Sequence, residues 1–130
     1  MKLLNKSKID EMLAAAKENP RLRVNFNFHD DLNETVNRLC IAALPGSPFA
    51  IQRHPDKWEM LCVVYGSLIC RWHDDTGRVV QELTFGTGEN IIVEIPAGTW
   101  HSLEVLTPCV FYEVKKGPYV PVAPEDTLVP

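Results

Sequence analysis

The chain contains GSPFAIQRHPDKWEMLCVVYG at Gly46–Gly66 and PAGTWH at Pro96–His101. In both stretches, glycine or proline stands beside short apolar runs, as is typical of β-strands joined by tight turns. Their polar side chains have a spacing that suits a metal site inside a small β-barrel. These side chains are Gln52, His54, Glu59 and His101.

Short strands dominate the chain from Val36 onward. Turns rich in glycine, proline and aspartate separate them, for example Asp74-Asp75-Thr76-Gly77. Many short strands with such turns predict a mainly β protein, either a sandwich or a barrel. The expected strands are 38–44, 49–54, 58–65, 68–73, 78–85, 91–95, 101–106 and 110–115.

Side chains two residues apart on a strand point to the same face. Gln52 and His54 therefore share a face. On the other two strands the shared faces are Glu59, Leu61, Val63 and Tyr65, and His101, Leu103 and Val105. Each candidate ligand stands at the end of an apolar row, which predicts an apolar cavity with polar groups at one mouth.

Two imidazoles and one carboxylate are the ligand set of facial-triad iron sites and of many zinc sites. Gln52 could add an amide oxygen as a weak neutral ligand, or could hydrogen-bond a metal-bound water. The alternative is a barrel without metal, in which His54 and His101 are simply hydrogen-bonded residues.

A helix of about three turns is expected before the strands. Ser7 is a plausible N-cap with Asp10 three residues later, and Asn19-Pro20 should end the helix because proline disfavours the α conformation of the preceding residue. The apolar stripe of this helix consists of Ile9, Leu13 and Ala16.

Residues 25–29, NFNFH, alternate strictly between polar and aromatic side chains. They predict either an edge strand with a solvated face or a polar row at the rim of a pocket or a subunit interface. We expect one domain over residues 1–130, divided into an N-terminal extension (1–35), a barrel (36–116) and an extended tail (117–130).

The bulk composition excludes several classes of protein. The formal charge of −4 gives no reason to expect a nucleic acid or an anionic membrane as partner. No apolar run is long enough to span a bilayer, and the N-terminus lacks the apolar core of a signal peptide, so a cytoplasmic protein is expected. The four cysteines form no C-x-x-C pair and are expected to be buried free thiols.

The two stretches resemble the motifs of the cupin superfamily. Its first motif is usually written G-x5-H-x-H-x3,4-E-x6-G, and the chain fits it except for Gln52 in place of histidine. The second, G-x5-P-x-G-x2-H-x3-N, fits through Pro96–His101 but has Asn90 for glycine and Val105 for asparagine. This resemblance implies a jelly-roll barrel.

Nearly the whole chain is similar to the WbuC-type cupin-fold metalloproteins. The stretches that carry this similarity are RLRVNFNFH at 21–29, HPDKWE at 54–59 and FYEVKKGPY at 111–119. The resemblance implies a divalent metal (Zn, Fe, Ni or Mn) held by Gln52, His54, Glu59 and His101. It also implies a role linked to surface-polysaccharide and amino-sugar synthesis.

Three further residues are candidates for catalysis, and a fourth has a predicted location. Glu113 is a general base if its face of the strand is interior, and part of a solvated pair with Lys115 if it is exterior. His29 is a second candidate base. Lys57 contacts an anionic substrate or is an exposed turn lysine. His73 lies at a hairpin and is expected at the surface.

Three functions remain open. The first is a metal-dependent isomerase or epimerase acting on a sugar or sugar phosphate, with Glu113, His29 and Lys57 as catalytic residues. The second is an iron-dependent dioxygenase at the same site, and the third is a non-catalytic, metal-stabilised barrel that binds a sugar or a partner protein. A homodimer is expected in each case, through outer sheet faces or the edge strand.

Overall fold

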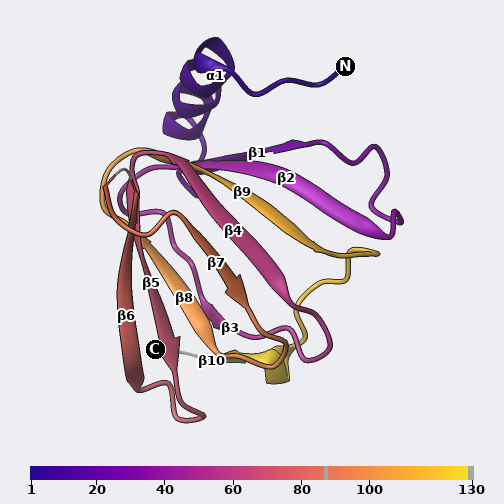
Figure 1. Cartoon of the computed structure of the whole chain (residues 1–130), viewed down its shortest axis with the longest axis vertical. Coiled ribbons are helices and arrows are strands. Elements are labelled where there is room, and N and C mark those ends of the chain that lie inside the picture. Colours follow the sequence, from indigo (N-terminus) through magenta and orange to yellow (C-terminus); the bar gives the residue numbers. More distant parts are fainter. Residues whose placement is uncertain (87, 129–130) are drawn as a thin grey trace.

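The computed structural model describes residues 1–86 and 88–128 of the chain. Two five-stranded antiparallel sheets make up its body, as Figure 1 shows. The first sheet has the order β1 (Arg23–Asn27), β2 (Val36–Ala43), β9 (Cys109–Lys116), β4 (Glu59–Tyr65) and β7 (Ile92–Ile95). The second has the order β10 (Thr127–Leu128), β3 (Ile51–Gln52), β8 (His101–Val105), β5 (Ser67–His73) and β6 (Val79–Gly86).

The chain crosses repeatedly between the two sheets, since β3, β5 and β8 belong to one sheet while β4, β7 and β9 belong to the other. This connectivity is that of a jelly roll. The mainly β, jelly-roll prediction is therefore confirmed, and the expected strands agree with the observed ones to within a few residues.

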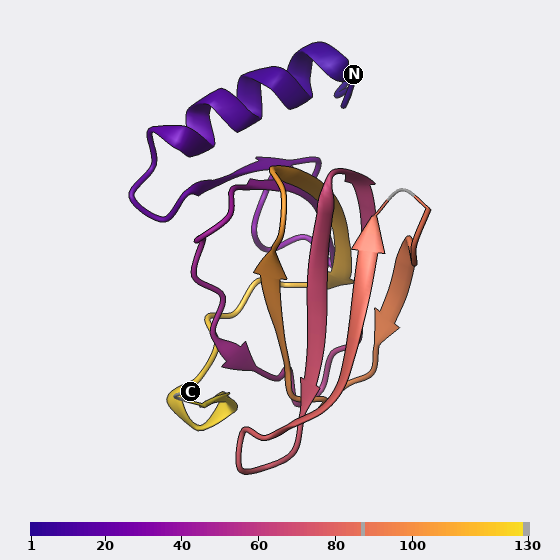
Figure 2. The same ribbon diagram turned by 90° about the vertical axis from the view of Figure 1, so that its left-hand side faces the viewer.

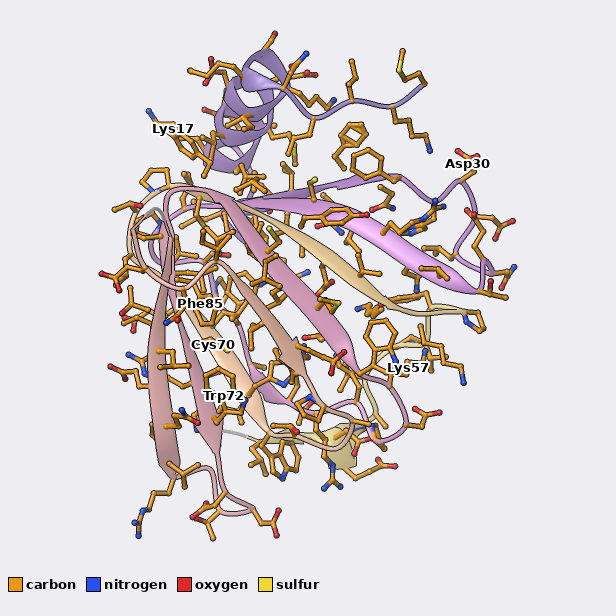
Figure 3. The ribbon with its side chains drawn as sticks, viewed as in Figure 1. Lys17, Asp30, Lys57, Cys70, Trp72 and Phe85 are labelled. Atoms are coloured by element: carbon orange, nitrogen blue, oxygen red, sulfur yellow. The ribbon has the colours of Figure 1, made fainter. Side chains whose placement is uncertain are left out.

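The hydrophobic core lies between the sheets. Alternate residues of the long strands point into it, and Phe111 at its centre is fully buried. Cys70 and Phe85 extend this core towards β6 (Figure 3). Burial raises the pKa of the Cys70 thiol to about 12. All four cysteines are free, as predicted, but Cys62 is half-buried rather than buried.

Helix α1 (Lys6–Lys17) packs on the outer face of the first sheet (Figures 1 and 2). Its buried Met12 contacts a second apolar cluster around Cys40 and Val110. The predicted N-cap was wrong. Asn5 caps the helix by accepting a hydrogen bond from the Lys8 N–H at 2.9 Å, because asparagine caps as well as serine and stands where the chain enters the helix. No helix in the described ranges is long and apolar enough to cross a membrane.

Strand β1 is an edge strand whose two faces have different roles. Phe26 and Phe28 stack at 5.1 Å and pack in the cluster beneath the helix. The alternate residues Asn25, Asn27 and His29 line a cavity on the inner side. The polar row predicted at 25–29 is thus a pocket wall on an edge strand.

Two side chains differ from the sequence-based expectations. A register shift between Val63 and Tyr65 turns Tyr65 outward, so that it does not continue the inward row of Glu59. An inserted residue changes the face of those beyond it, which strict alternation does not predict. His73 is buried rather than at the surface as predicted, because its Nε2 lies 2.8 Å from the Ser102 hydroxyl and its Nδ1 3.0 Å from the Gly77 carbonyl oxygen.

The tail is not simply extended as expected. It forms a short 3-10 helix (Pro124–Asp126) and strand β10, which pairs with β3. The buried Asp126 carboxylate accepts a hydrogen bond from Arg53 Nε at 2.8 Å. The tail therefore supports the strand that carries Gln52.

Candidate metal centre

Three chain segments bring the candidate ligands together. Glu59 is the first residue of β4 and His101 the first of β8, while His54 lies just beyond β3. The carbonyl oxygen of His54 accepts a hydrogen bond from the Gly98 N–H at 2.8 Å. That bond joins the loop after β3 to the Pro96–His101 turn, and so holds the two histidine-bearing segments against each other.

Glu59 lies between the two imidazoles. Its Oε1 is 2.9 Å from His101 Nε2, and its Oε2 is 3.3 Å from His54 Nε2. The side chains of Glu59 and His101 are each only 4% exposed. One ligand atom from each of these three residues lies within 4.8 Å of the others, as a shared metal ion requires.

The hydrogen bonding of the site fits a divalent cation. His54 Nε2 and Glu59 Oε2 are buried and have no hydrogen-bond partner among the described residues, although they face each other. The Nδ1 of His101 lies 2.9 Å from the Thr99 carbonyl oxygen. A bond there fixes the tautomer and leaves Nε2 as the coordinating nitrogen, the usual arrangement of a metal-binding histidine.

The electrostatics of the site favour a charged carboxylate. Burial raises the pKa of Glu59, but the close contacts with His101 and His54 and the positive charge of these imidazoles more than offset it and hold the pKa far below its usual range. For His101, burial lowers the pKa, while the hydrogen bond to Glu59 and its charge give a net rise. An ionised carboxylate is the form that binds a metal.

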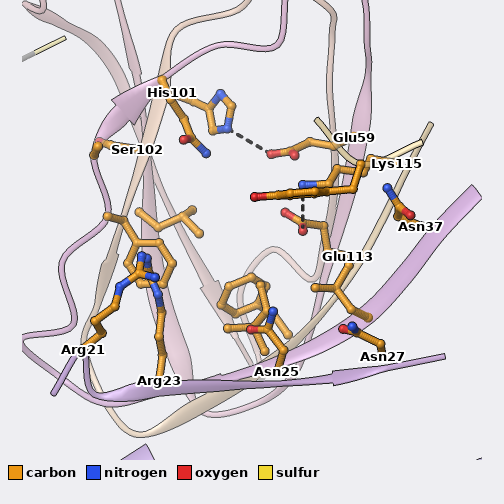
Figure 4. Close-up of a pocket in the computed structure, with 18 of the residues that line it drawn as sticks. Arg21, Arg23, Asn25, Asn27, Asn37, Glu59, His101, Ser102, Glu113 and Lys115 are labelled. Atoms are coloured by element: carbon orange, nitrogen blue, oxygen red, sulfur yellow. Dashed lines mark ion pairs between the residues drawn. The ribbon is translucent and has the colours of Figure 1, made fainter. Parts of the chain in front are cut away.

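A cavity of about 720 Å³ opens beside these residues. This volume lies within the range of roughly 300–1,000 Å³ typical of small-molecule sites. Glu59 and His101 form part of its wall (Figure 4). Gln52 also lines the cavity and is paired in register with His101 across β3 and β8. The expected fourth ligand therefore lies beside the group of three, and its coordination remains a prediction.

Glu113 faces the cavity rather than solvent. It is buried, and its Oε2 lies 3.6 Å from Lys115 Nζ (Figure 4). Burial and the charge of Glu59 raise the pKa of Glu113 to about 7, although Lys115 opposes the shift. Of the two interpretations of this strand, the interior one holds.

The other two catalytic candidates lie in different surroundings. His29 lines the cavity, but its Nδ1 faces the backbone of Arg38. That nitrogen lies 3.0 Å from the Arg38 amide nitrogen and 3.1 Å from the Arg38 carbonyl oxygen. Lys57 is not among the residues that line the cavity. It lies in the turn before β4 (Figure 3), and its ammonium donates to the Pro118 carbonyl oxygen at 2.7 Å, so it points to the tail.

A family model described as "Domain of unknown function (DUF6016)" matches residues 4–85, more than half of the chain. The chain belongs to the DUF6016 family. No curated protein matches the sequence.

Solved structures similar to this DUF6016 chain include cupin-superfamily proteins. TT1209 from Thermus thermophilus aligns with a TM-score of 0.65 at 15% identity, over 89% of this chain and 97% of that one. KdgF from Halomonas sp. aligns with a TM-score of 0.61 at 12% identity, over 78% of this chain and 84% of that one. A cupin-superfamily sugar phosphate isomerase, SPO2919 from Silicibacter pomeroyi, aligns with a TM-score of 0.58 at 20% identity. The alignment covers 82% of this chain and 64% of that one.

The chain spans only a quarter of the length of another similar structure, the oxalate decarboxylase of Lactobacillus farciminis, which it matches with a TM-score of 0.54 at 20% identity. At these identities the likeness establishes the fold alone. It agrees with the cupin resemblance of the two motifs.

Three residues that line the cavity have no functional role predicted from the sequence. Arg21 and Arg23 extend the polar row of β1, and their alternate spacing was the available signal. Asn37 is only 2% exposed, and both polar atoms of its amide lack a partner in the described structure. Nothing in the sequence around Asn37 distinguishes it from a surface asparagine of a strand.

Proposed function

We propose that this chain is a small metal-binding cupin that catalyses isomerase- or epimerase-like chemistry on a sugar or sugar phosphate. The observation that carries the proposal is the His54, Glu59 and His101 group, of which Glu59 and His101 line a cavity that Glu113 also lines. A divalent metal held by these three residues, with Gln52 as a weak fourth, supplies a Lewis acid that polarises a substrate carbonyl.

In this proposal Glu113 moves the proton. A buried carboxylate facing the cavity can remove a proton from the carbon beside a carbonyl and return it to the neighbouring carbon. Lys115, 3.6 Å away, stabilises its ionised form. His29 is the weaker candidate because the Arg38 backbone occupies its Nδ1. Lys57 lies outside the cavity wall and has no catalytic role in this proposal.

The activity is tested by solvent exchange. Metal-loaded protein is incubated with D-fructose 6-phosphate and other ketose and aldose phosphates in D₂O, and proton NMR follows deuterium entry beside the carbonyl. Wild type should exchange and Glu113→Gln should not. Absence of exchange with every substrate would reject the isomerase proposal, and oxygen consumption by the iron form would favour the dioxygenase, for which the same ligand set is suited.

Restoring the missing histidine should strengthen metal binding. We expect Gln52→His to bind Zn²⁺ about tenfold or more tightly than wild type, because imidazole is a better ligand than an amide for borderline metals. Competition with a chromogenic chelator measures the change. The control is Asn25→His, which adds an imidazole to the cavity wall on β1. Equal affinities of wild type and Gln52→His would mean that residue 52 does not reach the metal.

The finer family assignment is also a proposal. The similarity of residues 21–29, 54–59 and 111–119 to WbuC-type cupin-fold metalloproteins supports a link to surface-polysaccharide synthesis. Deletion of the gene should then alter the surface polysaccharide of the producing cell. An unchanged polysaccharide would remove that link while leaving the metal chemistry open.

We further propose a homodimer. Strand β1 forms one edge of its sheet, and near the opposite edge Val64, Ile91 and Ile92 are 45%, 51% and 59% exposed. Exposed apolar side chains beside a sheet edge favour association with a second copy. Light scattering should give twice the monomer mass of 14.7 kDa, and a monomeric mass at micromolar concentration would contradict the proposal.

A further inference from the structure

We propose that Arg21 and Arg23 form an anion-binding subsite in the cavity, on the side away from Glu59 and His101 (Figure 4). The ligand is then a small hydroxylated molecule that carries a phosphate or carboxylate group at its far end. The proposal deepens the proposed function, since it concerns the same cavity, but the subsite itself does not depend on a metal.

The backbone of Arg21 is held on both sides. Its N–H donates to Asn19 Oδ1 at 2.8 Å, and its carbonyl oxygen accepts from the Ser47 hydroxyl at 2.8 Å. The next residue, Leu22, has a φ of 55°, a conformation that non-glycine residues adopt rarely and at a cost. These contacts fix the chain where it turns into β1 and direct the Arg21 side chain to the cavity.

The guanidinium of Arg23 is preorganised in a different way. It lies over the Phe49 ring, 4.2 Å from its centroid, and one of its nitrogens donates to the Pro48 carbonyl at 2.6 Å. A guanidinium has five N–H donors, so most of them stay available. A stacked, planar guanidinium suits bidentate binding of phosphate or carboxylate.

These two arginines differ from the paired arginines of the chain. Arg38, Arg53 and Arg71 each form an ion pair with a carboxylate. Within residues 1–86 and 88–128, neither Arg21 nor Arg23 does so. The acidic groups of the cavity, Glu59 and Glu113, lie on the side of the metal centre (Figure 4). An incoming anion is therefore attracted to the arginines and repelled by the carboxylates.

The buried amide of Asn37 indicates what the rest of the ligand presents. Buried amides almost always have hydrogen-bond partners, and this one has none among the described residues although it lines the cavity. An amide can donate to and accept from the same hydroxylated ligand. Asn25 and Asn27 add further amides to the same cavity (Figure 4). The polar lining thus matches a polyol with an anionic end.

The test uses the whole chain of 130 residues after treatment with a chelator, so that no bound metal contributes to anion binding. Isothermal titration calorimetry measures the binding of four ligands: inorganic phosphate, D-fructose 6-phosphate, D-gluconate and neutral sorbitol. Each is titrated into wild type, Arg21→Gln, Arg23→Gln and Asn37→Ala. Arg78→Gln is the matched control, because Arg78 lies in a hairpin turn outside the cavity. Circular dichroism verifies that each variant is folded.

We expect each arginine variant to bind inorganic phosphate and D-fructose 6-phosphate about tenfold or more weakly, with Arg78→Gln unchanged. Asn37→Ala should weaken D-fructose 6-phosphate but leave inorganic phosphate unaffected. Preference for D-fructose 6-phosphate or for D-gluconate identifies phosphate or carboxylate as the natural group.

Sorbitol binding as tightly as both anions, or phosphate binding that is equal in wild type and Arg21→Gln, would overturn the subsite. Arg21→Gln is the decisive variant because Arg23→Gln also loses its stacking on Phe49. Metal loading of these same proteins is measured separately, so loss of the subsite and failure of the metal proposal give different results.

Discussion

Replacing Glu59 by glutamine is expected to weaken divalent-metal binding on the order of 100-fold or more. Glutamine keeps the shape of the side chain but removes the negative charge that lies between His54 and His101. Without that carboxylate, two neutral imidazoles leave the divalent charge uncompensated in a buried site, which weakens binding. Metal content by mass spectrometry and Zn²⁺ competition with a chelator measure the loss.

The control for this substitution is Glu113→Gln. Glu113 is also buried in the cavity wall, but it is not one of the three residues whose ligand atoms converge. It should therefore retain metal at close to one equivalent. If Glu59→Gln retained full affinity, or if both variants lost metal equally, the His54, Glu59 and His101 group would not be the metal centre.

The residues of this group were predictable because sequence spacing translates directly into sheet geometry. Glu59 and His101 each begin a strand, and the two turns before these strands come together through the bond from Gly98 to His54. Glycine and proline mark these turns in the sequence. The ends of these two strands, and the faces of Glu59 and His101, could therefore be assigned without a structure.

Other features required the folded chain. A bulge redirects Tyr65, and a bulge depends on the partner strand as much as on the bulged one. The burial of His73 depends on its contacts with Gly77 and Ser102. The unpaired state of the Asn37 amide is a property of everything that surrounds it. Composition and periodicity describe one segment at a time. They could therefore identify the polar row of β1, but not the side chains that lie beside it in the folded chain.

Asn37→Leu is expected to stabilise the protein while weakening its ligand binding. Leucine branches at the same atom as asparagine and is only somewhat larger, so it should fit beside the cavity. It removes two buried polar atoms that have no partner among the described residues. Such a replacement avoids a desolvation cost of about 1–3 kcal/mol. We expect the free energy of unfolding to rise by about 1–2 kcal/mol and the melting temperature by about 3–8 °C.

The opposite signs of the two effects make this substitution informative. Thermal denaturation of the ligand-free protein gives the stability, and titration with D-fructose 6-phosphate gives the affinity. Asn33→Leu, at an exposed loop position, is the control and should change neither by much. A buried amide that destabilises the fold is expected at a cavity wall when it is needed to bind the ligand. If Asn37→Leu instead lowered the melting temperature and left the affinity unchanged, the amide would serve the fold, and the polyol interpretation of the cavity would lose its strongest support.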